Sequence, residues 1–277
     1  MPQHRYTDVI LEVTGQIGVI KLNRPKSLNS FGGNLMSDLI AAIRELNEHP
    51  TTVFTVLTGE GRFFSAGADI KGVGDRLFNH DNASDAEKKL HTIARLSPAL
   101  EVLRQVIDHK KVFVLALNGP GVGGGAAWFQ GVADIVLAAE GAYLQVPFNA
   151  LGLVPENGSA INIAQSMGVH RANDFLMFGR KLTVEELEKW GLVNRIFPVE
   201  NFHRSVVKFL EEQLAVNDGK SMMETKRLQN APLRDGRMVA VVNALDALAE
   251  RIVEDVPTKR FAEKRKILEA KSKGSKL

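Results

Sequence analysis

The sequence of 277 residues contains no cysteine, which excludes disulfide bonds, thiol nucleophiles and thiolate metal sites. The seven histidines are scattered, and none stands at a spacing typical of metal ligands or beside a serine and an aspartate that would complete a nucleophilic triad. Ser65 and Ser159 likewise lack a partner that would activate them. We therefore expect no metal site and no serine or cysteine nucleophile.

The net charge is small, and aromatic residues are few. The formal net charge is only +3, and the chain has two tyrosines and two tryptophans, which is too little to predict nucleic-acid binding. No apolar run approaches the 18 or so residues of a membrane span, and the first residues lack the apolar core of a secretory signal. With 44% hydrophobic and 24% charged residues, the composition is typical of a globular protein with a substantial core.

The last three residues, Ser275, Lys276 and Leu277, form the C-terminal tripeptide that is read as a peroxisomal address. Chance is the alternative, because lysine and serine are frequent in this basic tail. We estimate a chance match at roughly one in a few thousand chains. The tripeptide predicts a peroxisomal location, with the import receptor as a partner.

Strands and helices are predicted to alternate up to about residue 200. Apolar and alternating runs predict a β-hairpin and further strands, at residues 8–22, 53–58, 112–117, 134–139, 142–147 and 192–198. Apolar residues at helical spacing predict helices at residues 35–46, 85–108, 159–167, 171–178 and 183–189, and helices alone after 200. This order predicts an α/β fold with residues 1–199 as the core and 200–277 as a helical C-terminal region.

Two loops of small residues each follow a buried strand. Residues 118–128 read Asn-Gly-Pro-Gly-Val-Gly-Gly-Gly-Ala-Ala-Trp, and residues 65–69 read Ser-Ala-Gly-Ala-Asp. Glycines at a helix start let another molecule approach unpaired N–H groups that the helix dipole makes slightly positive. If an N–H group from each loop points to the same place, the pair forms an oxyanion hole.

Two other interpretations of the glycine-rich stretch stay open. Residues 119–124 match the dinucleotide fingerprint G-x-G-x-x-G, but the acidic residue expected at the end of the next strand is missing, because Asp134 precedes that strand. Asp134 is instead expected to be a hydrogen-bonded structural carboxylate. The stretch can also be a structural turn that allows a helix and a strand to pack closely.

Three motifs resemble the crotonase (enoyl-CoA hydratase/isomerase) superfamily: residues 23–29 (Asn-Arg-Pro-Lys-Ser-Leu-Asn), 63–71 and 118–125. Three further segments, residues 147–155, 191–194 and 261–264, also fit, so the resemblance spans about residues 8–265. It implies a crotonase-like spiral of ββα turns with a C-terminal helical oligomerisation region, and homotrimers or dimers of trimers. It also implies an acyl-CoA substrate whose thioester oxygen is held by the N–H groups of Ala68 and Gly124.

The same resemblance bears on the reaction. Hydratases of the superfamily use two glutamates, and the matching positions here are Ala127 and Phe148, which can neither accept nor donate a proton. Glu156 matches the single catalytic glutamate of the 3-enoyl-CoA to trans-2-enoyl-CoA isomerases. Taken alone, a glutamate in a Pro-Glu-Asn-Gly turn is usually an exposed loop residue. Apolar neighbours are expected to raise its pKa towards neutrality.

The resemblance also implies a set of residues that contact the substrate and its CoA: Lys26, Leu28, Ala66, Asp69, Ile70, Phe148, Phe261 and Lys264. Phe261 and Lys264 would reach the CoA of a neighbouring subunit, and Asp69 is alternatively a cap or an anchor of its loop. We therefore predict an isomerase of unsaturated fatty acyl-CoA in β-oxidation that needs no cofactor. The alternatives are a hydratase or hydrolase of the same superfamily, and a non-catalytic acyl-CoA-binding subunit.

Overall fold

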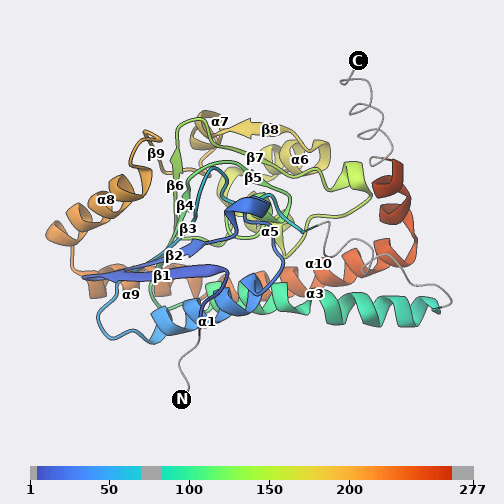
Figure 1. The fold of residues 1–277 in the computed structure, drawn as a ribbon, viewed down its shortest axis with the longest axis horizontal. Coiled ribbons are helices and arrows are strands. Elements are labelled where there is room, and N and C mark those ends of the chain that lie inside the picture. Colours follow the sequence, from blue (N-terminus) through green and yellow to red (C-terminus); the bar gives the residue numbers. More distant parts are fainter. Residues whose placement is uncertain (1–4, 70–82, 264–277) are drawn as a thin grey trace.

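The computed structural model describes residues 5–69 and 83–263 (Figure 1). Its main sheet has six strands in the order β1-β2-β3-β4-β6-β9. These strands are β1 (Val9–Thr14), β2 (Ile17–Leu22), β3 (Phe54–Gly59), β4 (Val112–Leu117), β6 (Ile135–Ala139) and β9 (Arg195–Phe197). The β1–β2 hairpin is antiparallel, and every other neighbouring pair is parallel. The hairpin and the buried strands predicted from the sequence are confirmed.

A second sheet has three short strands, β5 (Gly121–Val122), β7 (Tyr143–Gln145) and β8 (Lys181–Thr183), in the order β5-β7-β8. Of these only β7 was predicted. β5 is two residues long and half glycine, so it carries no alternating pattern. Thr183 was predicted to begin a helix. In the structure Thr183 ends β8 and caps the helix that follows.

The α-helices alternate with the strands up to β9 and then follow one another, as predicted. They are α1 (Leu35–Glu48), α3 (Asp85–Ile107), α4 (Gly124–Ala127), α5 (Ser159–Met167), α6 (Val169–Phe178), α7 (Val184–Lys189), α8 (Phe202–Val216), α9 (Gly219–Asn230) and α10 (Arg234–Val253). The described residues also contain two 3₁₀ turns, η1 (Pro25–Ser27) and η2 (Asn149–Leu151). Side-chain caps explain two of the starts, since Ser84 with Glu87 and Thr183 with Glu186 form capping boxes.

Both faces of the main sheet are covered. In β4 the odd-numbered residues from Phe113 to Leu117 belong to the core shared with α1 and α3. The alternate residues, from Val112 to Ala116, pack in a second apolar cluster with Phe202, Val206 and Leu210 of α8. Strand side chains alternate between faces, so a continuous apolar run such as β4 indicates a strand buried on both sides. Along the lower edge of the molecule in Figure 1, α10 lies beside α3.

Within residues 5–69 and 83–263, no helix is long and apolar enough to cross a membrane. The same residues contain no group of three potential metal-ligating side chains. Several predicted functional residues lie outside the described parts of the chain: Ile70, Lys264, Ser275, Lys276 and Leu277.

Candidate active site

The loop that follows β3 is held against the turn at residues 24–29. The Asn29 side chain donates to the carbonyl oxygens of Glu60 (2.9 Å) and Phe63 (2.8 Å), and the Ser65 hydroxyl donates to the Asn29 carbonyl (2.7 Å). The Ala66 N–H donates to the Leu28 carbonyl at 2.9 Å. Leu28 and Ala66, both predicted to contact CoA, are therefore direct neighbours.

Ala68 forms a parallel β-bridge with Phe31. The bonds of this bridge are made by the residues on either side: Phe31 N–H donates to the Gly67 carbonyl (2.7 Å), and Asp69 N–H donates to the Phe31 carbonyl (3.4 Å). In an extended chain successive N–H groups point in opposite directions, so the N–H of Ala68 points away from Phe31. It has no acceptor among the residues that the structure describes.

The glycine-rich stretch lies directly against this loop. The Val122 N–H donates to the Ser65 carbonyl at 2.9 Å, and Gly121 forms a parallel bridge with Ser65. Gly67 has a φ of +82°, and a Cβ atom there would lie 2.6 Å from the Val122 carbonyl oxygen and 3.1 Å from the Gly124 nitrogen. The two loops that the sequence analysis singled out therefore touch through their backbones.

Gly124 is the first residue of α4, so its N–H has no acceptor within the helix. It has none elsewhere in the described parts of the chain. The helix that was predicted to start at these glycines is short, since α4 ends at Ala127 after a single turn. A macrodipole needs many aligned peptides, so the direction of the free N–H groups, rather than a helix dipole, makes this place suited to a negative oxygen.

Glu156 stands in the loop between η2 and α5. Its backbone is fixed because its carbonyl accepts the Ser159 N–H at 2.9 Å, where α5 begins. Its side chain is half-buried, and Oε2 accepts a hydrogen bond from the indole Nε1 of Trp128 at 2.9 Å. Burial raises the pKa of the Glu156 carboxyl above its ordinary value, and the bond from Trp128 acts in the opposite direction. The pKa is thus shifted in the direction predicted from the apolar neighbours.

The indole of Trp128 connects Glu156 to the glycine-rich stretch. A Cβ atom on Gly124 would lie only 2.9 Å from Trp128 Nε1. The indole also stacks on Phe31, with ring centroids 4.2 Å apart and an interplanar angle of 10°. The same indole nitrogen therefore lies close to Gly124 and donates to the carboxyl of Glu156. The sequence analysis did not assign a role to Trp128, although a buried indole N–H usually needs an acceptor.

The two positions at which hydratases of the superfamily carry glutamates are apolar and buried. Ala127 is 1% exposed and Phe148 is 2% exposed, and both side chains belong to the main hydrophobic core. Phe148 was predicted to contact the substrate. Its side chain is buried in the core cluster that also contains Leu144 and Val146. Neither position can supply a second acid or base.

Asp69 anchors its loop. Its Oδ2 is 3.1 Å from Arg24 Nη2, and Nη1 of the same guanidinium donates to the Ser30 carbonyl at 2.6 Å. This agrees with the alternative role of Asp69 as an anchor. Lys26 is exposed on η1, where a side chain can reach a ligand phosphate.

Residues 251–256 pack against the loop that leads to Glu156. A Cβ atom on Gly152 would lie 2.7 Å from Val256 Cγ1, and Arg251 Nε donates to the Gly152 carbonyl at 3.2 Å. Residues 256–263 are helical, and Phe261 is half-buried within them. The described part of the C-terminal region thus packs against this loop at Gly152.

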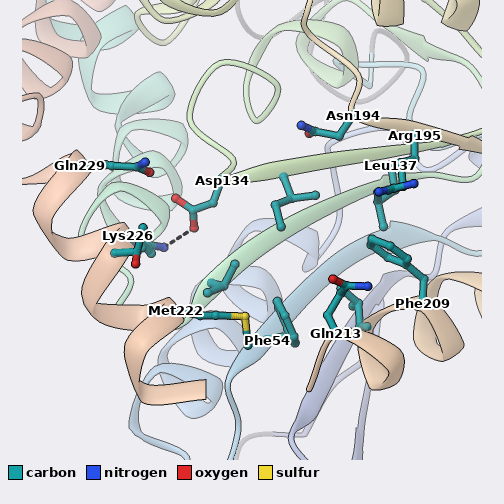
Figure 2. Close-up of a pocket in the computed structure, with 14 residues that line it drawn as sticks. Phe54, Asp134, Leu137, Asn194, Arg195, Phe209, Gln213, Met222, Lys226 and Gln229 are labelled. Carbon is teal, nitrogen blue, oxygen red and sulfur yellow. Dashed lines mark ion pairs between the residues drawn. The ribbon is translucent and has the colours of Figure 1, made fainter. Parts of the chain in front are cut away.

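A cavity of about 440 Å³ lies elsewhere, on the sheet face covered by α8 and α9 (Figure 2). Phe54 and Leu137 of the sheet line it together with Phe209 and Met222 of the two helices. At one end Lys226 Nζ lies 2.8 Å from Asp134 Oδ2, the ion pair drawn in Figure 2. None of the predicted catalytic or CoA-binding residues lines this cavity.

Asp134 has the structural role expected of it. Its Oδ2 accepts the Phe113 N–H at 2.7 Å, and its Oδ1 accepts the Asn230 side chain at 2.9 Å. With Lys226 these bonds tie the start of β6 to β4 and α9. A carboxylate occupied in this way is not the acidic group of a dinucleotide site, which must be free to hold a ribose.

Residues 12–268 match the enoyl-CoA hydratase/isomerase family. The chain belongs to this family. It is 31% identical over 265 residues to a Delta(3,5)-Delta(2,4)-dienoyl-CoA isomerase of Pyricularia oryzae, which covers 91% of this chain and 94% of the relative. It is also 34% identical over 200 residues to enoyl-CoA delta isomerase 2 of Rattus norvegicus, a match that covers 70% of this chain and 48% of the relative.

The fold agrees with this membership. The crystal structure of an enoyl-CoA hydratase/isomerase from Pseudoalteromonas atlantica superimposes with a TM-score of 0.79 and 23% sequence identity. The match covers 92% of this chain and 96% of the crystallised chain. The crotonase fold predicted from the sequence is thus confirmed, including the helical C-terminal region.

Proposed function

We propose that this chain is an enoyl-CoA isomerase that moves the double bond of a 3-enoyl-CoA to the trans-2 position in fatty-acid β-oxidation. The observation that carries the proposal is the position of Glu156. It is a half-buried carboxyl with a raised pKa, held by the indole that borders Gly124. The two glutamate positions of hydratases are occupied by buried Ala127 and Phe148.

One carboxylate is sufficient for this reaction. Glu156 takes a proton from C2, and the electron pair of the C2–H bond delocalises into a dienolate whose negative charge rests mainly on the thioester oxygen. The N–H groups of Ala68 and Gly124 hold that oxygen. The same carboxyl then returns the proton to C4, which leaves a double bond between C2 and C3. A raised pKa brings the carboxyl closer to the operating pH, where a group that must both accept and donate a proton works best.

Removing the C2 proton and returning one at C4 changes no oxidation state. The proposal therefore requires no redox cofactor, and CoA enters as part of the substrate. Lys26, Leu28 and Ala66 lie on the two loops next to Ala68, which supports their proposed contact with CoA.

A dienoyl-CoA isomerase is a second candidate, favoured by the dienoyl-CoA isomerase relative that matches nearly the whole chain. That reaction moves a proton from C2 to C6, a longer span than C2 to C4. A single carboxylate such as Glu156 has less distance to span in the shorter transfer. For this reason the 3-enoyl-CoA reaction remains the first proposal.

A homo-oligomer, trimer or dimer of trimers, is part of the proposal. Large apolar side chains are exposed on α5, α6 and α10, among them Ile161 (52%), Phe178 (77%) and Val239 (58%). Because α5 packs against both α6 and α10, these exposed side chains lie on neighbouring helices, which supports contact with further copies of the chain. Light scattering of the purified protein should give the mass of three or six copies, and a monomer would contradict it. The peroxisomal location stays a prediction from Ser275, Lys276 and Leu277.

The reaction is tested by incubating the purified protein separately with trans-3-hexenoyl-CoA, trans-2-hexenoyl-CoA and a 3,5-dienoyl-CoA. The proposal predicts conversion of the first to the conjugated 2-enoyl thioester, which absorbs in the ultraviolet. A 3-hydroxyacyl or free-acid product without isomerisation would indicate a hydratase or hydrolase. Tight binding without any turnover would indicate a non-catalytic acyl-CoA-binding subunit.

A further inference from the structure

The two oxygens of Glu156 have different surroundings. Oε2 accepts the hydrogen bond from Trp128 Nε1 at 2.9 Å. Oε1 accepts no hydrogen bond from the residues that the structure describes. An oxygen whose lone pair already holds an N–H group is a weaker base than one that is free, so the two oxygens are not equivalent as proton acceptors.

The indole itself has little freedom to move. Its ring is stacked on Phe31 at a centroid distance of 4.2 Å, and it meets the ring of Phe129 edge-on at 6.3 Å. Trp128 is 8% exposed, and its backbone N–H donates to the Gly124 carbonyl at 3.0 Å. The donor is therefore fixed to the same short helix whose first N–H group faces the candidate oxyanion position.

We propose that Trp128 is a positioning residue that holds Oε2 of Glu156, so that Oε1 is the oxygen that takes the proton from C2 and returns it to C4. This inference rests on the proposed function. Because Trp128 also borders Gly124, it sets the separation between the carboxyl that moves the proton and the N–H group that holds the thioester oxygen.

The carboxyl's titration agrees with this arrangement. The Trp128 N–H favours the ionised form of Glu156 and so opposes the rise in pKa that burial causes. Removing the N–H must therefore raise the pKa further. The carboxylate, the form that accepts the proton, would then be lost at a higher pH than in the wild type.

Trp128→Phe keeps an aromatic ring against Phe31 and removes the N–H donor together with the rest of the five-membered ring. We expect kcat to fall at least tenfold with KM nearly unchanged, and the acidic limb of the rate profile to move up by about one pH unit. The matched control is Trp190→Phe, which removes the other tryptophan, located near the exposed Arg171 and Arg180. A Trp128→Phe variant with wild-type kcat and an unmoved pH profile would overturn the proposal.

A second measurement does not depend on how well Trp128→Phe folds, and its decisive step, the loss of the titration in Glu156→Gln, does not depend on turnover. In the Trp190→Phe protein Trp128 is the sole tryptophan, so its fluorescence reports on its own surroundings. We expect its emission to titrate with the same midpoint as the acidic limb, and the titration to disappear when Glu156→Gln is added. A titration that survives Glu156→Gln overturns the pairing in solution. If the titration depends on Glu156 but no 3-enoyl-CoA is converted, the pairing stands and the proposed function fails.

Discussion

A Cβ atom on Gly124 would lie 2.9 Å from Nε1 of Trp128, closer than real Cβ atoms approach a neighbour. The backbone at Gly124 has an ordinary helical conformation that alanine can adopt, so only the space is restrictive. The indole is held by its stacking on Phe31 and has little room to retreat. Glycine at this position is thus required by the indole that holds Glu156.

Gly124→Ala should therefore move Trp128 and disturb both Glu156 and the N–H group of residue 124. We expect kcat to fall by about 10-fold or more, since one misplaced oxyanion donor alone costs about 10²–10³. Gly236→Ala is the control, because Gly236 lies in α10 with nothing within 4 Å of an added Cβ. It should keep full activity and gain about 0.5–1 kcal/mol of stability. Wild-type turnover in Gly124→Ala would contradict this prediction, because the indole would have made room for the Cβ atom with no effect on kcat.

The raised pKa of Glu156 makes a prediction about stability. A carboxyl whose pKa is higher in the folded protein than in the unfolded chain binds protons more tightly when folded. Glu156 stabilises the folded protein fully when the pH is below its pKa in the unfolded chain. This stabilisation is lost as the pH rises through its pKa in the folded protein.

Glu156→Gln, which cannot ionise, should therefore be more stable than the wild type at pH 8, and this advantage should shrink towards pH 5. Urea unfolding of both proteins across this range measures the difference. An advantage that is independent of pH, or that grows in acid, would mean that burial does not raise this pKa.

Asp134, which pairs with Lys226 outside the candidate active site, should contribute strongly to stability. The Lys226 side chain is 6% exposed and that of Asp134 is 15% exposed, and burial lowers the pKa of Lys226 despite its partner. Asp134→Ala leaves this ammonium buried without its counter-charge, and we expect a loss of about 3–5 kcal/mol. Adding Lys226→Met should recover part of the loss.

The exposed pair Lys110–Glu48 is the control, with side chains that are 66% and 69% exposed. Glu48→Ala should cost little stability, because water screens this exposed pair. Equal losses from Asp134→Ala and Glu48→Ala in urea unfolding would refute the structural role assigned to Asp134.

The sequence predicted the elements whose side chains carry a periodic pattern. The alternation in residues 8–22 and the apolar run at residues 112–117 depend only on which faces of a strand are buried, and they predict β1, β2 and β4 correctly. β5 was missed and the end of α4 could not be predicted, because glycine and alanine leave their conformation to be decided by neighbouring loops.

The candidate site was predicted in part. Glu156, Ala68 and Gly124 were identified through a family resemblance, since nothing in a Pro-Glu-Asn-Gly turn distinguishes an acid/base group from an exposed loop residue. Trp128 could not be assigned from the sequence, because its hydrogen bond to Glu156 joins residues 28 positions apart. That contact depends on how α4 and the loop before α5 pack, which no local pattern records.

The proposed function depends on Glu156 as the sole group that moves the proton. It is tested most directly by following the absorbance of the conjugated thioester with trans-3-hexenoyl-CoA for the wild type, Glu156→Gln and the control Glu140→Gln, whose side chain is exposed at the end of β6. Glu156→Gln should lose about 10²–10⁴ in kcat, because glutamine cannot accept and return the proton. Both the wild type and Glu140→Gln should turn over normally. A loss of less than tenfold in Glu156→Gln would contradict it.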